Sequence, residues 1–235
     1  MADIKSFKEH IEAFLQEKSN AIVQNDKNGF DFIKKIYNEF SLQHELGNYL
    51  SNNGYEIFYE VNVKKILCLN LDYYTSNHAC LGDCKNKNDW AKKEIDIVAI
   101  KRDNNGNIKE KYAIELKFPQ NGRYPEEMFD FIKDICFMEQ VKECWNNSKT
   151  FCITLTNDKN FYSDGKKISD EPYKYFRTEK SDSICHIENK EPIEYPTNKK
   201  DKQKPIQIIG KYNIEWHKLD DNIRYYCLEM NNGEI

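Results

Sequence analysis

Two carboxylates and one lysine lie on neighbouring segments whose residue pattern is that of β-strands. Asp96 lies in segment 94–101, and Glu115 and Lys117 lie in segment 111–118. Side chains alternate across a strand, so Glu115 and Lys117 share one face of theirs. The Asp-, Asn- and Gly-rich residues between the segments are a strong turn signal. A hairpin would therefore bring Asp96 beside the other two.

Such a group of side chains fits the binding of a hard divalent cation. Two close carboxylates repel each other, and one of them takes up a proton unless a cation lies between them. Mg²⁺ prefers oxygen ligands and keeps several waters. We expect Asp96, Glu115 and the carbonyl of Leu116 to bind Mg²⁺, with Mn²⁺ as an alternative. Lys117 would orient the attacking water, and the cation would polarise a scissile phosphate.

The competing interpretation is a surface hairpin with Lys–Glu pairs between its strands, worth about 0.2–1 kcal/mol per pair. A Glu-x-Lys spacing occurs in many strands by chance. An Asp on the preceding strand, across a hairpin, makes the pattern considerably more specific.

Asp96, followed by Glu115-Leu116-Lys117, resembles the signature of the PD-(D/E)xK, restriction-endonuclease-like nuclease superfamily. The resemblance covers roughly residues 30–156. It implies that Asp96 and Glu115 bind Mg²⁺ and that Lys117 assists the attacking water.

The resemblance extends to segment 41–61, which is similar to the first core helix and strand of the superfamily. A glutamate on that helix often completes the metal site, and Glu45 matches its position. We therefore include Glu45 among the expected catalytic and metal-binding residues. One departure is that Ile95, not proline, precedes Asp96.

The elements that must position these residues follow from hydrophobic periodicity. We expect a helix within 1–29, one or two helices within 30–50, strands at 55–63, 94–101 and 111–118, a helix at 126–145, a strand at 149–156, and short strands within 206–230. This order predicts an α/β protein with a mixed central sheet flanked by helices. The resemblance implies a restriction-endonuclease-like αβββαβ core with extra C-terminal strands.

We expect a single domain over 1–235. It would consist of an N-terminal helical extension (1–29), a catalytic core (30–156) and a loop-rich part with the C-terminal strands (157–235).

Composition restricts the class of protein. The chain has 235 residues, of which 39% are hydrophobic and 13% aromatic, enough for a packed core. No apolar run approaches the roughly 20 residues that span a bilayer. The N-terminus lacks the pattern of a signal peptide, so we expect a cytoplasmic protein whose eight cysteines are reduced thiols. A net charge of −4 argues against a wholly electrostatic nucleic-acid binder.

Some weaker signals have ordinary explanations that we favour. Glu60 and Glu94 could join the acidic cluster, but we interpret both as solvated strand residues. Gln140 is interpreted as a surface or helix-packing residue. The segment 172–177 interleaves aromatic with basic residues, which suits base stacking or packing against the core, and the sequence leaves both open.

A cysteine- and histidine-containing segment raises the question of zinc. His78, Cys80 and Cys84 stand close together, but their spacing is not that of a standard zinc finger. We interpret them as incidental thiols in a loop rather than as a structural Zn²⁺ site.

The expected function is that of a Mg²⁺-dependent DNA endonuclease, with restriction or genome defence as its setting. One alternative is a repair, recombination or phage-related nuclease that recognises DNA structure. Another is a catalytically inactive nucleic-acid-binding module of the same fold. A homodimer would suit an enzyme that cuts both strands. The sequence fixes neither the DNA specificity nor the cleavage pattern.

Overall fold

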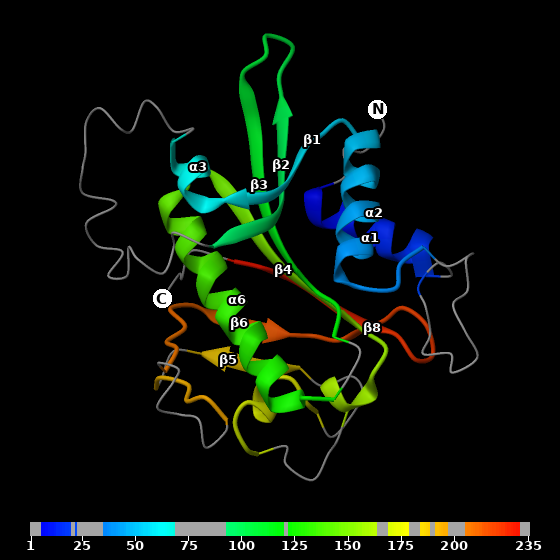
Figure 1. The fold of residues 1–235 in the computed structure, drawn as a ribbon, viewed down its shortest axis with the longest axis vertical. Helices are drawn as coiled ribbons and strands as arrows, with labels where there is room; N and C mark the ends of the chain where they lie inside the picture. Colours follow the sequence, from blue (N-terminus) through cyan, green and yellow to red (C-terminus); the bar gives the residue numbers. More distant parts are fainter. Residues whose placement is uncertain are drawn as a thin grey trace.

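The computed structural model describes residues 6–19, 22, 35–68, 93–119, 122–163, 169–178, 184–188, 191–196 and 205–230. Its centre is a six-stranded sheet with the strand order β1-β2-β3-β4-β8-β7. Helices α1 and α2 cover one face of this sheet and α6 covers the other (Figure 1). The predicted α/β class, with a mixed sheet flanked by helices, is confirmed.

The N-terminal part and the centre of the chain supply most of these elements. They are α1 (Phe7–Lys18), α2 (Glu39–Asn52), β1 (Glu56–Asn62), α3 (Val63–Cys68), β2 (Glu94–Arg102), β3 (Ile108–Lys117), α6 (Tyr124–Cys144) and β4 (Ser148–Thr156). Each element expected between residues 55 and 156 is present with slightly shifted ends. The short helix α3 was not predicted.

The pairing of the strands is mixed. β1 pairs with β2 and β2 with β3 in antiparallel fashion, whereas β3 and β4 are parallel. Parallel neighbours need a crossover connection, and α6 supplies it. The predicted turn between β2 and β3 is also present: the Asp103 carboxylate accepts hydrogen bonds from the N–H groups of Asn105 and Asn107, and Gly106 has a φ of 83°. The two strands extend beyond the helices as a long hairpin (Figure 1).

Alternation along the strands directs side chains into two hydrophobic cores. Ile114 and Leu116 pack on the α1–α2 side, and Ala113 packs on the α6 side, as the alternation of a strand requires. The same alternation would place Ile95 and Ile97 of β2 on one face, but it does not hold there. Ile97 packs on the α1–α2 side but Ile95 packs on the α6 side, so the alternation is broken next to Asp96.

The C-terminal part extends the main sheet and adds a small one. β8 (Arg224–Glu229) pairs with β4, and β7 (His217–Lys218) pairs with β8. β5 (Cys185–Glu188) and β6 (Lys211–Ile214) form a separate two-stranded sheet. β6, β7 and β8 confirm the short strands expected within 206–230, whereas β5 was not predicted.

Segment 172–177 packs inward rather than offering a surface for bases. Phe176 is fully buried, and the Arg177 guanidinium lies 4.1 Å from the centre of the Tyr173 ring. The packing alternative is therefore the one found.

Two further expectations concern a zinc site and the membrane. The zinc candidates His78, Cys80 and Cys84 lie outside the described residues. Along the part of the chain that is described, no helix has the length and apolarity that crossing a bilayer requires.

Candidate active site

Asp96 connects β2 to β3 at the end of the hairpin opposite its turn. The paired positions of these strands run from Arg102 and Ile108 down to Ile97 and Ile114, and stop one residue before Asp96. There the Asp96 Oδ2 accepts the backbone N–H of Leu116 at 2.6 Å. Beyond the end of the backbone pairing, this side-chain hydrogen bond holds Asp96 against the segment that carries Glu115 and Lys117.

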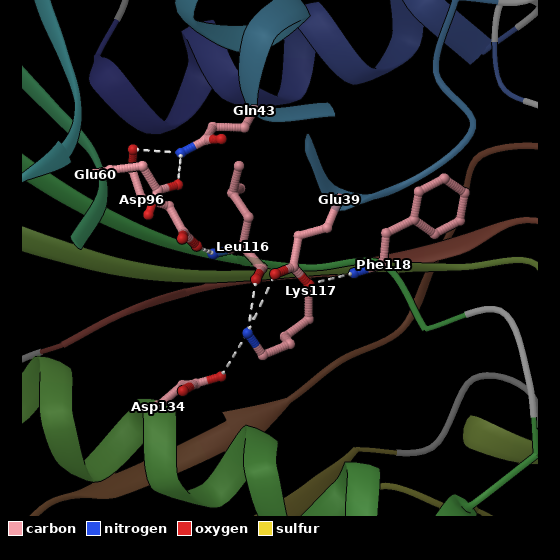
Figure 2. A network of polar contacts seen from close by, with 8 residues as sticks. All are labelled: Glu39, Gln43, Glu60, Asp96, Leu116, Lys117, Phe118 and Asp134. Atoms are coloured by element: carbon pink, nitrogen blue, oxygen red, sulfur yellow. Dashed lines mark hydrogen bonds and ion pairs between the residues drawn. The ribbon is translucent and has the colours of Figure 1, made fainter. Parts of the chain in front are cut away.

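The Lys117 ammonium is surrounded by oxygen atoms from three elements (Figure 2). Its Nζ lies 3.1 Å from the carbonyl oxygen of Leu116, 3.3 Å from Asp134 Oδ2 on α6 and 3.5 Å from Glu39 Oε1 on α2. Burial lowers the pKa of Lys117, but the surrounding carboxylates outweigh this and raise its pKa above the usual value. The lysine therefore remains a cation.

Glu115 is a buried carboxylate that lacks a hydrogen-bond donor. It is 6% exposed, and its Oε1 contacts no donor in the described part of the chain. Burial first, and then the charges of Asp96 and Asp134, raise its pKa well above the ordinary value. An unsatisfied buried polar atom is rare in native proteins and needs an explanation.

Glu139 shows how this protein satisfies a buried carboxylate that has a structural role. It is 5% exposed, as buried as Glu115. Its oxygens accept hydrogen bonds from the N–H groups of Ile209 and Gly210 and from the Tyr212 hydroxyl. Unlike Glu139, Glu115 has an oxygen that no donor among the described residues satisfies.

Asp96 has a perturbed pKa as well. Burial raises it to about 7, assisted by the nearby carboxylates of Glu39 and Glu60, while the N–H of Leu116 and the charge of Lys117 act in the opposite direction. Lys93 adds a second positive charge near Glu115 and Asp134, and the carboxylates of the cluster still outnumber the two ammonium groups.

Asp134 is a member of this cluster that the sequence analysis missed. Its side chain is 14% exposed and forms the ion pair with Lys117. A signal was present, since Asp134 stands three residues after Phe131 and four before Met138, both of which are buried. A carboxylate on the buried stripe of a helix points to a role beyond solvation.

The structure does not bring Glu45 to the cluster. Its Oε2 lies 3.9 Å from the Lys18 ammonium of α1, on another side of α2. The α2 carboxylate that reaches the strands is Glu39, whose Oε2 accepts the N–H of Phe118 at 3.3 Å. The correction has a geometric cause: the rotation of α2 about its axis is set by how it packs on both α1 and the sheet.

Gln43, one helical turn after Glu39, also faces the strands. Its Nε2 donates to the Asp96 carbonyl oxygen and to Glu60 Oε1, both at 2.7 Å (Figure 2). Glu60, interpreted above as merely solvated, is therefore tied to the neighbourhood of Asp96. Gln140 donates to Cys136 Sγ within α6, which agrees with the helix-packing interpretation. Glu94 is exposed.

The carboxylates of the cluster offer oxygen ligands. No set of three His, Cys, Asp or Glu side chains among the described residues is arranged to hold a metal ion. Mg²⁺ is usually bound through one or two carboxylates, with waters or substrate oxygens completing the octahedron. The carboxylates of Asp96 and Glu115 fit this requirement in type and number, and the unsatisfied Glu115 Oε1 provides a free acceptor for a cation.

Comparison with known proteins adds no relative: no family model, curated protein or solved structure matches this chain.

Proposed function

We propose that this protein is a Mg²⁺-dependent nuclease of the PD-(D/E)xK type that hydrolyses DNA phosphodiester bonds. The observation that carries the proposal is the buried, unsatisfied carboxylate of Glu115, beside Asp96 and Lys117 on adjacent strands. The order of elements from α2 to β4 supports it, since among the described residues a helix, three strands, a helix and a strand follow one another, with the short α3 between β1 and β2.

Asp96, Glu115 and the Leu116 carbonyl would hold the cation. The Lys117 ammonium donates to that carbonyl in the structure, so the ammonium would have to leave this oxygen for a cation to bind it. Mg²⁺, or Mn²⁺ in its place, would supply the positive charge that polarises a scissile phosphate and activates an attacking water.

Lys117 acts in this proposal as a positive charge and hydrogen-bond donor, not as a proton acceptor. The carboxylates of Asp134 and Glu39 stabilise its charged form. A fixed ammonium beside the reacting phosphate stabilises the negative charge that develops in the transition state.

Cleavage of mixed plasmid and single-stranded DNA with Mg²⁺, beside an EDTA control, tests the proposal. We expect cleavage that EDTA abolishes and that Lys117→Ala and Asp96→Asn reduce at least about 100-fold, while DNA binding largely survives. Lys149→Ala is the matched control, because Lys149 on β4 forms its ion pair with Glu229, away from the cluster. Equal cleavage by Lys117→Ala and wild type would overturn the catalytic assignment.

The same assay addresses the kind of substrate. Preference for intact duplexes would favour a restriction or defence enzyme, and preference for branched or single-stranded DNA would favour a repair, recombination or phage-related nuclease. Titration calorimetry with Mg²⁺ and Mn²⁺ provides a separate test: no binding of either ion would favour a non-catalytic module.

A further inference from the structure

Gln43 occupies an unusual place for an amide side chain. It lies in the second turn of α2 and is 4% exposed. Its amide nitrogen carries two hydrogens, and both have acceptors: the Asp96 carbonyl oxygen on β2 and Glu60 Oε1 on β1, each at 2.7 Å. One side chain therefore connects α2 to both strands.

These contacts coincide with an irregularity of the sheet. In the β1–β2 register Tyr59 pairs with Ile97 and Val61 with Ile95, and no pairing is formed by Glu60 and Asp96 between them. Glu60 has a φ of 49°, a left-handed conformation that a residue other than glycine rarely adopts without support. On the other side of β2, the pairing with β3 stops one residue short of Asp96. The backbone around Asp96 thus depends on side chains rather than on a regular ladder.

Asp96 is consequently held from two directions. Its carbonyl oxygen accepts the Gln43 amide, and its carboxylate accepts the N–H of Leu116 at 2.6 Å. The first contact fixes the backbone from the side of α2, and the second fixes the side chain against β3. Loss of the first would leave a backbone carbonyl without its donor and free Asp96 to rotate.

We propose that Gln43 is a positioning residue, which holds the backbone of Asp96 so that its carboxylate lies beside Glu115 at the cation site. The inference rests on the proposed function only where metal binding is concerned. Outer partners that orient a ligand commonly contribute about 10- to 100-fold in metal affinity or activity.

The first readout needs neither metal nor activity. In selectively ¹⁵N-leucine-labelled protein with EDTA, the Leu116 amide proton reports its hydrogen bond to the Asp96 carboxylate. We expect Gln43→Ala and Gln43→Glu to shift this signal and to speed its hydrogen exchange. The control Thr150→Val removes a buried side-chain hydrogen bond to the Met138 carbonyl oxygen and should leave the Leu116 signal in place.

The second readout is the affinity for Mn²⁺, measured by calorimetry. Both Gln43 variants should bind Mn²⁺ at least about 10-fold more weakly than wild type, and Thr150→Val should bind it with less than a twofold change. In a cleavage assay the same variants should lower kcat more than they change KM for DNA.

A double variant separates positioning from packing. The combination of Gln43→Glu with Glu60→Gln places the hydrogen-bond acceptor on α2 and the donor on β1. The hydrogen bond between these two side chains can therefore form again. The Asp96 carbonyl still lacks a donor. We expect the double variant to recover thermal stability relative to Gln43→Glu, but not the Leu116 amide signal or the Mn²⁺ affinity.

Three results decide the inference. Recovery of both the Leu116 signal and the Mn²⁺ affinity in the double variant would overturn it, because Gln43 would then act only as a link between α2 and β1. An unchanged Leu116 signal in the single variants would overturn it as well. If the wild type binds no Mn²⁺ but the single variants shift the Leu116 signal, the metal proposal fails and the positioning of Asp96 stands.

Discussion

At the scale of single residues, the candidate site is a cluster of carboxylates that outnumber the ammonium groups beside them. Asp96, Glu115 and Asp134 all have a pKa raised by burial. Lys117 is the cation they have in common. A buried charge without a partner destabilises a fold, so the cluster is expected to lower the stability of the protein.

Glu115→Gln tests this cost. The substitution keeps the size of the side chain and replaces the acid by an amide that carries no charge at any pH. Burial disfavours the ionised form of Glu115 and raises its pKa, so we expect the free energy of unfolding at pH 8 in EDTA to rise. Urea denaturation measures it, with Glu139→Gln as a control that should destabilise, because its carboxylate is satisfied. A less stable Glu115→Gln protein would contradict the expectation.

Asp134→Asn tests the role of α6 in holding the lysine. Asp134 is the strongest of the carboxylates that raise the pKa of Lys117. Without its charge more of the amine is neutral at a given pH, so we expect faster acetylation of Lys117 in EDTA, followed by mass spectrometry. Asp130→Asn is the matched control, since Asp130 pairs with Lys133 on the same helix. Equal Lys117 labelling rates in both variants and wild type would show that the pair has no influence.

At the scale of elements, α2 must lie very close to β1 for Glu39 and Gln43 to reach the strands. The close approach occurs at Gly47, one turn after Gln43. A Cβ atom built there would lie 2.1 Å from the Tyr59 hydroxyl oxygen and 2.6 Å from its ring. A glycine at this position therefore allows the helix to contact the strand beside Glu60.

Gly47→Ala should consequently destabilise the protein, although alanine in a helix interior is normally favoured over glycine by about 1 kcal/mol. We expect a lower melting temperature for Gly47→Ala and a recovery when Tyr59→Ala is added, because the clash is with the tyrosine ring. Differential scanning calorimetry of both variants and of Tyr59→Ala alone measures this. A Gly47→Ala protein that melts above wild type would mean that the contact is looser than the structure indicates.

At the scale of the whole molecule, the cluster joins three layers. Asp96 lies near the start of β2 and Lys117 is the last residue of β3, so both lie at the end of the hairpin opposite its turn. α2 contributes Glu39 from one side of the sheet, and α6 contributes Asp134 from the other. All three layers must therefore fold before these charged side chains come together. The protonation of these side chains consequently affects the stability of the whole protein.

The pH dependence of unfolding should show this coupling. The pKa of Asp96 is raised from 3.8 to about 7 in the folded state, so between these values the folded protein retains a proton that the unfolded chain has released. This contribution is complete below the unfolded pKa and is lost as the pH rises through 7. We expect the melting temperature in EDTA to fall from pH 5 to pH 8, and Asp96→Asn to reduce the fall.

Mg²⁺ should have the opposite pH dependence, because it binds the ionised carboxylates. We expect Mg²⁺ at about 10 mM to raise the melting temperature at pH 8 and to have little effect at pH 5. Calorimetry at both pH values checks this. An equal shift in wild type and Glu115→Gln would place any Mg²⁺ binding elsewhere.

Sequence alone determined the part of the site that lies on the strands. Alternation and the short turn predicted that Glu115 and Lys117 share a face and that Asp96 lies beside them, because strand periodicity and hairpin closure are local properties. The ladder between Ile97 and Ile114 and the hydrogen bond from Leu116 to Asp96 agree with that prediction. The nuclease function itself stays a prediction.

Only the tertiary structure decided which helix residues join the strands. Glu39 and Gln43 face the cluster and Glu45 faces Lys18, because packing on α1 and on the sheet fixes the rotation of α2. Asp134 joins because α6 crosses the opposite face to connect two parallel strands. Helix rotation depends on contacts between residues far apart in sequence, whereas the strand positions depend on neighbours, and this is the physical reason for the difference.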